Sequence, residues 1–168
     1  MSSLLNLGFL VVAQENGSYS GYYLVTNSLG RPLEFRLSSA VQPNKVQQVL
    51  YAGTLVPYIC GELIGKALVE KAAVPVSLVV TTCEAALELR RKLDVPVAYL
   101  AGADDKRPGL DAPGGRLLCH GDYEGDPAAV MELLGQLAGG LTLAEPFNRV
   151  REAMAEARKL GVGARSAA

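Results

Sequence analysis

The segment LLCHGDYEGD, residues 117 to 126, carries the only histidine of the chain, His120, directly after Cys119. Three acidic residues follow at a spacing of two: Asp122, Glu124 and Asp126. A cysteine with a histidine in hydrogen-bonding reach can act as a thiol nucleophile with its general base. Adjacent residues of a strand point to opposite faces, so Cys83 is a better partner for His120 than Cys119 is. The alternative, which we favour, is a polar strand end followed by loop acids, with Asp126 as the cap of the next helix.

A second set of candidates for catalysis consists of carboxylates. The first aspartate of the chain is Asp94, so a metal-dependent nuclease would have to rely on glutamates before it. Glu15, Glu62 and Glu84 would have to converge to hold two metal ions across a phosphate. Cys60, Cys83 and Cys119 with His120 are chemically able to bind zinc, but none of their spacings is a recognised ligand pair. The sequence therefore predicts no metal site and no cofactor.

Binding residues are expected in three places. The loop AGADDKRPGLDAPGG, from residue 101, contains Asp104, Asp105, Lys106 and Arg107 and suits a ligand or partner contact. Tyr22 and Tyr23 lie in a predicted hairpin, and Phe147 leads an apolar stripe on the last predicted helix. The chain contains neither the P-loop nor the dinucleotide-binding glycine pattern, which argues against those nucleotide chemistries.

Composition limits the classes of function. The 168 residues are 49% hydrophobic and 20% charged, as expected of a globular protein with a full core. A net charge of −1 argues against nucleic acid as a partner, although a local basic patch stays open. Three cysteines without a C-x-x-C pair predict no intramolecular disulfide and a reducing, cytoplasmic setting. The apolar N-terminal stretch LLNLGFLVVA lacks the marks of a signal peptide and is too short to span a bilayer, so we expect no membrane association.

The pattern of apolar residues predicts an antiparallel meander at the start of the chain. Its strands cover residues 8 to 14, 21 to 27 and 33 to 38, with a positive φ at Gly30 in the second turn. From Pro43 the period becomes helical, and Pro57 predicts a kink between Thr54 and Pro57.

Strands and helices then alternate along the rest of the chain. A strand (76 to 82), a helix (83 to 93) and a strand (95 to 101) predict parallel pairing. A loop (102 to 115), a short strand (116 to 121), a helix from Asp126 and a last helix (145 to 160) follow. The apolar stripe of that last helix is expected to dock on the domain or on a partner.

These elements predict an α/β fold: a three-stranded antiparallel meander, a long kinked helix, β-α-β units and a C-terminal helix. Over residues 8 to 101 this element order resembles that of the ribonuclease-H-like fold. We expect one domain over residues 1 to 143, a C-terminal helix over 144 to 161 and a flexible tail over 162 to 168.

In function, we favour a non-catalytic protein-binding or assembly module of a cytoplasmic complex, bound to a protein partner or to itself. The alternative is an enzyme at the carboxyl ends of the strands. It would be a divergent phosphodiesterase or nuclease using Glu15 and Glu84, or a thiol hydrolase using Cys83 or Cys119 with His120.

Overall fold

The computed structural model describes residues 5–137 and 139–161, and its centre is a mixed sheet of seven strands. The strands follow the order β3-β2-β1-β4-β5-β7-β6 across the sheet. Their bounds are β1 (Asn6–Glu15), β2 (Ser18–Asn27), β3 (Pro32–Leu37), β4 (Leu78–Thr81), β5 (Val97–Ala101), β6 (Leu110–Ala112) and β7 (Gly115–Cys119). The predicted α/β class is thus confirmed.

The meander forms as the sequence predicts. β1 pairs with β2 over its full length, from Asn6 opposite Asn27 to Glu15 opposite Ser18, and β3 pairs antiparallel with β2. The second turn depends on Gly30, whose φ of +84° is the left-handed conformation that glycine adopts at little cost. Alternating residues place Leu24 and Phe35 opposite each other on one face of this edge.

The predicted long helix is a helical segment of changing geometry, Lys45–Lys71. It consists of α1 (Lys45–Tyr51), a 3-10 turn η1 (Ala52–Thr54), α2 (Leu55–Pro57), a π-helix η2 (Tyr58–Gly65) and α3 (Lys66–Lys71). The break falls at Ala52, which has φ 47° and ψ −124°, just before the predicted kink. Pro57 then stands in the first turn of the second piece, where a missing N–H costs no helical hydrogen bond.

By length and apolar composition alone, this segment is the one described helix that is able to cross a membrane. Its second half is a core helix, because Ile59, Cys60 and Ile64 are buried against the sheet. Gly61 allows a close approach to η3 (Glu84–Lys92): a Cβ there would lie 2.7 Å from the backbone nitrogen of Leu89.

The parallel pairing predicted for the centre of the sheet is confirmed. β4 pairs parallel with both β1 and β5. The connection between β4 and β5 is a 3-10 helix, η3 (Glu84–Lys92), where an α-helix was expected. The expected long loop contains the short strand β6, which forms a hairpin with β7, and β7 runs antiparallel to β5.

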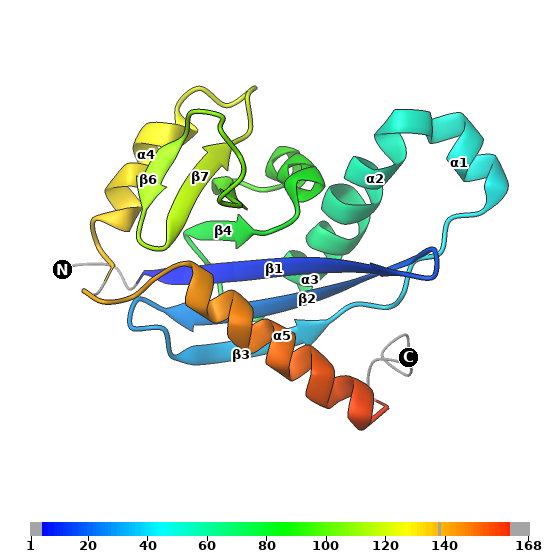
Figure 1. Cartoon of the computed structure of the whole chain (residues 1–168), viewed down its shortest axis with the longest axis horizontal. Coiled ribbons are helices and arrows are strands. Elements are labelled where there is room, and N and C mark those ends of the chain that lie inside the picture. The colour runs from blue at the N-terminus through cyan, green and yellow to red at the C-terminus, as the bar shows by residue number, and fades with distance from the viewer. Residues whose placement is uncertain (1–4, 138, 162–168) are drawn as a thin grey trace.

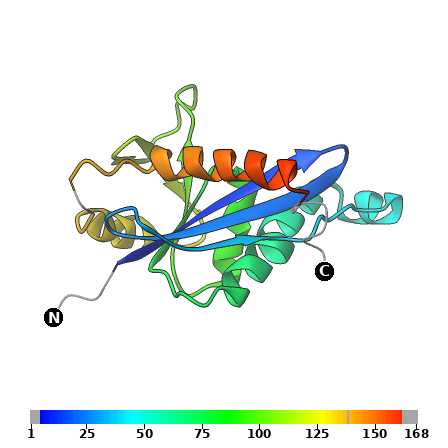
Figure 2. The same ribbon diagram turned by 90° about the horizontal axis from the view of Figure 1, so that it is seen from below.

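Helices cover both faces of the sheet, so the molecule has three layers (Figures 1 and 2). On one face η2, α3 and η3 enclose a core around Tyr23, Ile59 and Leu89. On the other face α4 (Asp126–Leu134) and α5 (Ala144–Lys159) enclose a core around Phe9 and Phe147. The C-terminal helix expected over 144 to 161 is α5, and its apolar stripe docks on this domain: Phe147, Val150 and Met154 are buried. The tail expected over 162 to 168 lies outside the described residues.

Candidate functional site

His120 follows β7, and both of its ring nitrogens are engaged. Nδ1 accepts a hydrogen bond from the backbone N–H of Asp122 (3.1 Å), and Nε2 lies 3.1 Å from Oε1 of Glu88. Because Nδ1 is an acceptor, Nε2 carries the ring proton and donates a hydrogen bond to Glu88. The ring also meets Tyr123 edge-on, at 5.3 Å between centroids. This arrangement leaves no free nitrogen to act as a general base.

The direction of β7 separates His120 from Cys83. Cys119 pairs with Ala98, which pairs with Val80 on β4, three residues before Cys83. Because β7 is antiparallel to β5, His120 continues toward the amino end of β5, whereas Cys83 lies beyond the carboxyl end of β4. Cys83, Cys119 and His120 could meet at one edge only if their strands were parallel neighbours, and β7 runs antiparallel to β5. The catalytic pair of Cys83 with His120 is therefore not assembled.

Cys83 instead contacts Cys60. The two thiols are hydrogen-bonded, and the nearby backbone N–H groups of Ala86 and Ala85 also favour the thiolate of Cys83. The hydrogen bond from Cys60 lowers the pKa of Cys83 to about 7, against the opposing effect of burial. The same bond and burial raise the pKa of Cys60. Cys119 has no such donors, and burial raises its pKa to about 11. All three cysteines are free thiols.

The three glutamates of the proposed metal site do not converge. Each carboxylate pairs with a different cation, at distances of 3.3 Å (Glu15 with Arg158), 3.4 Å (Glu62 with Lys92) and 2.7 Å (Glu84 with Arg107). On β1, the residue level with Thr81 near the end of β4 is Leu10. Across residues 5–137 and 139–161, no group of three or more His, Cys, Asp or Glu side chains is placed to hold a metal ion.

The charged loop after β5 is occupied with its own contacts. The Arg107 guanidinium donates to both carboxylate oxygens of Glu84 (2.7 and 2.9 Å) and also binds Asp105. These hydrogen bonds lower the pKa of Glu84 and bring that of Asp105 to about 2. Arg116 holds the backbone oxygens of Asp105 and Arg107. Two of the predicted binding residues, Asp105 and Arg107, thus tie the loop to η3, while Asp104 and Lys106 are exposed.

The basic run 90–92 contains a structural ion pair that the sequence did not reveal. Arg90 donates to Asp126 from Nε (2.8 Å) and Nη2 (3.3 Å), and its guanidinium lies 3.9 Å from the ring centre of Tyr123. Asp126 is therefore not the helix cap that we predicted. It stands inside α4, and its carboxylate faces η3 because Arg90 binds it there.

The predicted aromatic binding residues lie in the core. Tyr22 and Tyr23 are 5% and 0% exposed, and Phe147 is 1% exposed. Phe147 meets Phe9 edge-on, at 5.3 Å between ring centroids. Tyr23 lies over Gly8, where a Cβ would stand 2.3 Å from the tyrosine oxygen. These side chains pack the domain and offer no binding surface.

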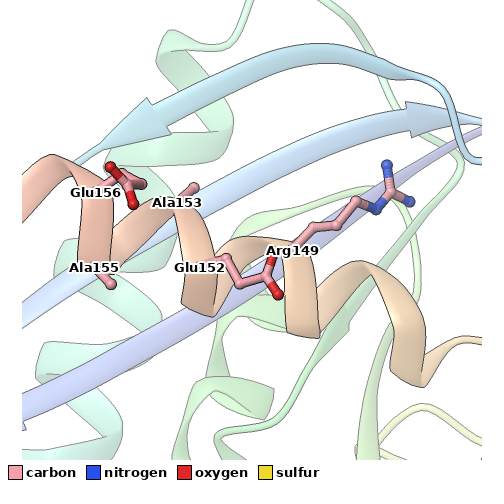
Figure 3. Close-up of a pocket in the computed structure, with 5 residues that line it drawn as sticks. All are labelled: Arg149, Glu152, Ala153, Ala155 and Glu156. Carbon is pink, nitrogen blue, oxygen red and sulfur yellow. The ribbon is translucent and has the colours of Figure 1, made fainter.

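The described surface has several concave places, and one of about 330 Å³ is lined by His120, Glu84 and Glu88. Another depression of about 390 Å³ is lined by residues of α5 alone, among them Arg149, Glu152 and Glu156 (Figure 3). A third, of about 510 Å³, lies between the end of β3 and α3, with Arg36 and Lys71 at its rim. Neither of these last two brings together groups with unusual chemistry.

The most unusual surface is α1. A capping box starts this helix: the Asn44 side chain accepts from the N–H of Gln47, and the Gln47 side chain accepts from the N–H of Asn44. Yet none of its residues is buried. Val46, Val49 and Leu50, spaced by three and four, are 65%, 72% and 76% exposed. In both views α1 projects beyond the sheet (Figures 1 and 2).

No family model matches the chain, and no curated protein matches it.

Proposed function

We propose that this protein is a non-catalytic protein-binding module that assembles through α1, with a second copy of the chain as the partner. The observation that carries this proposal is the fully exposed apolar face of α1, formed by Val46, Val49 and Leu50. A short amphipathic helix gains little stability by itself in water, and tertiary packing normally supplies it. Here the packing surface is available for another molecule.

The chemistry around α1 favours a protein partner over a membrane. Helices that bind membrane surfaces are rich in Lys and Arg on their polar face. Between Arg36 and Glu62 the chain has a single charged residue, Lys45, and the polar positions of α1 include the neutral Gln47 and Gln48. A neutral, aliphatic face has no charge that would select a charged partner. It also has none that would repel an identical helix, so it suits pairing with itself.

The size of the surface sets the expected strength of the pairing. The surface that a seven-residue helix can bury is far smaller than the roughly 800 Å² that each partner buries in a stable interface. We therefore expect weak, reversible pairs, with a Kd of roughly 10 µM to 1 mM.

We also infer that the fold has ribonuclease-H-like topology. The order β3-β2-β1-β4-β5, in which β2 alone runs antiparallel, supports this, as do helices after β3 and after β4. The β7-β6 hairpin would be an addition at the edge of the sheet. The phosphodiesterase chemistry known on such sheets gains no support, because Leu10 occupies the place on β1 where a carboxylate would be needed. Three free thiols are compatible with the cytoplasmic setting that we propose.

Sedimentation velocity of the full chain tests the proposal, at concentrations from about 10 µM to about 1 mM to span the expected Kd. The wild type should shift from monomer toward dimer. The double variant Val49→Glu/Leu50→Glu should remain a monomer, because two carboxylates would have to be desolvated in the interface. Leu29→Glu is the matched control. Leu29 is 68% exposed but lies in the β2–β3 turn, so this variant should associate as the wild type does.

Two outcomes of the sedimentation experiment would contradict the proposal. A wild type that stays monomeric over the whole range would contradict self-assembly. So would a dimer that survives the double substitution in α1. The melting temperatures of all three proteins should agree within about 2 °C, because exposed substitutions change stability little.

A further inference from the structure

Cys60 and Cys83 lie on two segments that pack in the same core: η2, and the turn between β4 and η3. Cys60 lies in η2 and is 1% exposed, whereas Cys83 follows β4, precedes η3 and is partly exposed. η2 and η3 touch at Gly61, where even a Cβ would come within 2.7 Å of the Leu89 nitrogen. Cys60 is buried in the core on this face of the sheet, Cys83 packs against the same core, and the two thiols are hydrogen-bonded.

The surroundings of Cys83 favour a thiolate. The N–H groups of Ala86 and Ala85, at the amino end of a nine-residue helix, help to lower the pKa of Cys83, and the Ala86 N–H donates to the carbonyl oxygen of Cys83 at 3.0 Å. The side chain of Thr81 holds the backbone N–H of Cys83 at 3.0 Å, which fixes the turn that presents the sulfur. The thiolate is the reactive form of cysteine, and nearby N–H donors stabilise it. A buried cysteine without such donors stays a thiol and is inert.

We propose that Cys60 and Cys83 form a thiol–disulfide couple, in which Cys83 reacts with a hydroperoxide and Cys60 closes an intramolecular disulfide. A small oxidant suits Cys83 because the side chain is only partly exposed. Cys60 is out of reach of the oxidant and can act only on the neighbouring sulfur.

The two steps balance as follows. The Cys83 thiolate attacks one oxygen of the hydroperoxide, the O–O bond breaks, and the leaving alkoxide or hydroxide takes up a proton. Cys83 is then a sulfenic acid, oxidised by two electrons. The sulfur of Cys60 attacks the sulfur of Cys83, an S–S bond forms, and the sulfenic oxygen leaves as water with the proton of Cys60. In sum, two thiols and one hydroperoxide give a disulfide, an alcohol or water, and a second water.

This couple differs from a structural disulfide, which the sequence argues against. The cysteines are reduced in the structure, and the fold does not need them linked. Oxidation would join η2 to the junction of β4 and η3, two parts that are already in contact. The reaction rests on this contact alone and is independent of any role of α1.

Cys119 provides an internal control. It is partly exposed like Cys83, but its pKa of about 11 contrasts with about 7 for Cys83. At pH 7 the difference in thiolate fraction, reduced by the lower nucleophilicity of the more acidic thiol, predicts alkylation of Cys83 on the order of 50- to 100-fold faster than that of Cys119.

The experiment treats the full-length wild type with hydrogen peroxide, blocks the remaining thiols and maps tryptic peptides without reduction. Trypsin places each cysteine on its own peptide: residues 46–66, 72–90 and 117–149. We expect one new species that joins the first two peptides and is released by a reductant. Cys119→Ser should give the same species. Cys60→Ser should stop at a sulfenic acid on Cys83, which dimedone traps, and Cys83→Ser should give neither product.

The wild-type measurements decide the matter even if a variant fails to fold. The proposal is overturned if peroxide converts Cys83 to sulfinic acid without a link to Cys60. It is equally overturned if Cys119 supplies the disulfide, or if iodoacetamide modifies Cys83 no faster than Cys119.

Discussion

Two helices of this chain, α1 and α5, carry apolar side chains that differ in their exposure to solvent. In α5 the residues Phe147 and Val150 are each 1% exposed, whereas in α1 the residues Val49 and Leu50 are 72% and 76% exposed. Both helices show apolar residues at spacings of three and four. The difference lies in what each helix can reach. α5 packs on a face of β1 and β2 that no other described helix covers. α1 projects from the domain, ends at Ala52 and packs on no described strand.

The comparison teaches that an apolar stripe alone does not identify a binding surface. The stripe of α5 was the stronger candidate for a partner in the sequence, and it stabilises its own domain. α1 looked like the first turns of a core helix, and it is the surface left open. The predictions below test this contrast, beginning with the largest expected effect.

Truncation after Gly140 removes α5 and should abolish cooperative unfolding. Burial of each of the side chains Phe147, Val150 and Met154 contributes about 1.5 to 3 kcal/mol to the free energy of unfolding. Their sum is comparable with the whole stability of a typical domain, about 5 to 15 kcal/mol. Circular dichroism during thermal unfolding checks this, with truncation after Gly161 as the control that should melt like the wild type. A cooperative, unshifted transition without α5 would break the comparison.

Single truncations of side chains should separate the two helices next. Phe147→Ala leaves a cavity against Phe9 and should lower the free energy of unfolding by about 3 to 5 kcal/mol. Leu50→Ala removes a similar apolar group from an exposed site and should change it by less than about 0.5 kcal/mol. Urea titrations of monomeric samples measure both values. Equal losses would mean that α1 is packed after all.

Glu34 explains why α3, at the other end of the same helical segment, is held while α1 is free. Its carboxylate accepts hydrogen bonds from the N–H groups of Ala73 (3.0 Å) and Val74 (3.0 Å) and pairs with Arg36 (2.6 Å). Burial would raise the pKa of Glu34, but these donors outweigh burial and lower it below its ordinary value of 4.5. Glu34→Gln should therefore cost about 1 to 2 kcal/mol at pH 7.

The sign of the pH dependence of this anchor follows from the lowered pKa. A carboxylate whose pKa is lower in the folded state stabilises the protein above its unfolded value and loses that contribution as the pH falls through the folded value. The stability curves of the wild type and Glu34→Gln should thus differ at pH 7 and approach each other below pH 4.5. A constant difference over this range would argue against the anchor.

The smallest effect is expected at the junction of α1 and η1. Ala52 has a φ of 47°, a conformation that costs an alanine more than a glycine. Ala52→Gly should stabilise the chain by up to about 1 kcal/mol, because glycine adopts this conformation at little cost. Destabilisation, measured in the same urea titrations, would show that the junction is helical and that α1 continues into η1.

Much of the fold could be predicted from residue periodicity. The alternation in the meander, the helical spacing after Pro43 and the glycine at position 30 each act locally, and each was visible in the sequence. The strand β6 was missed because three residues in a loop rich in glycine and proline carry no period. The antiparallel direction of β7 was missed for the same reason, and with it the separation of His120 from Cys83.

The candidate site depended on contacts between residues that are distant in the chain. His120 with Glu88 and Arg90 with Asp126 lie 32 and 36 residues apart, and single-chain spacing does not reveal such pairs. Cys60 and Cys83 are 23 residues apart, and their spacing likewise does not reveal that their side chains meet.

Hydrogen exchange at two protein concentrations tests the central contrast most directly. At about 1 µM, below the expected Kd, the amides of α1 should exchange with little protection, while those of α5 should approach the protection set by global unfolding. Near 1 mM the protection of α1 should rise as pairs form, and that of α5 should stay unchanged. Protection of α1 that is already high at the lower concentration, or that does not depend on concentration, would contradict the account.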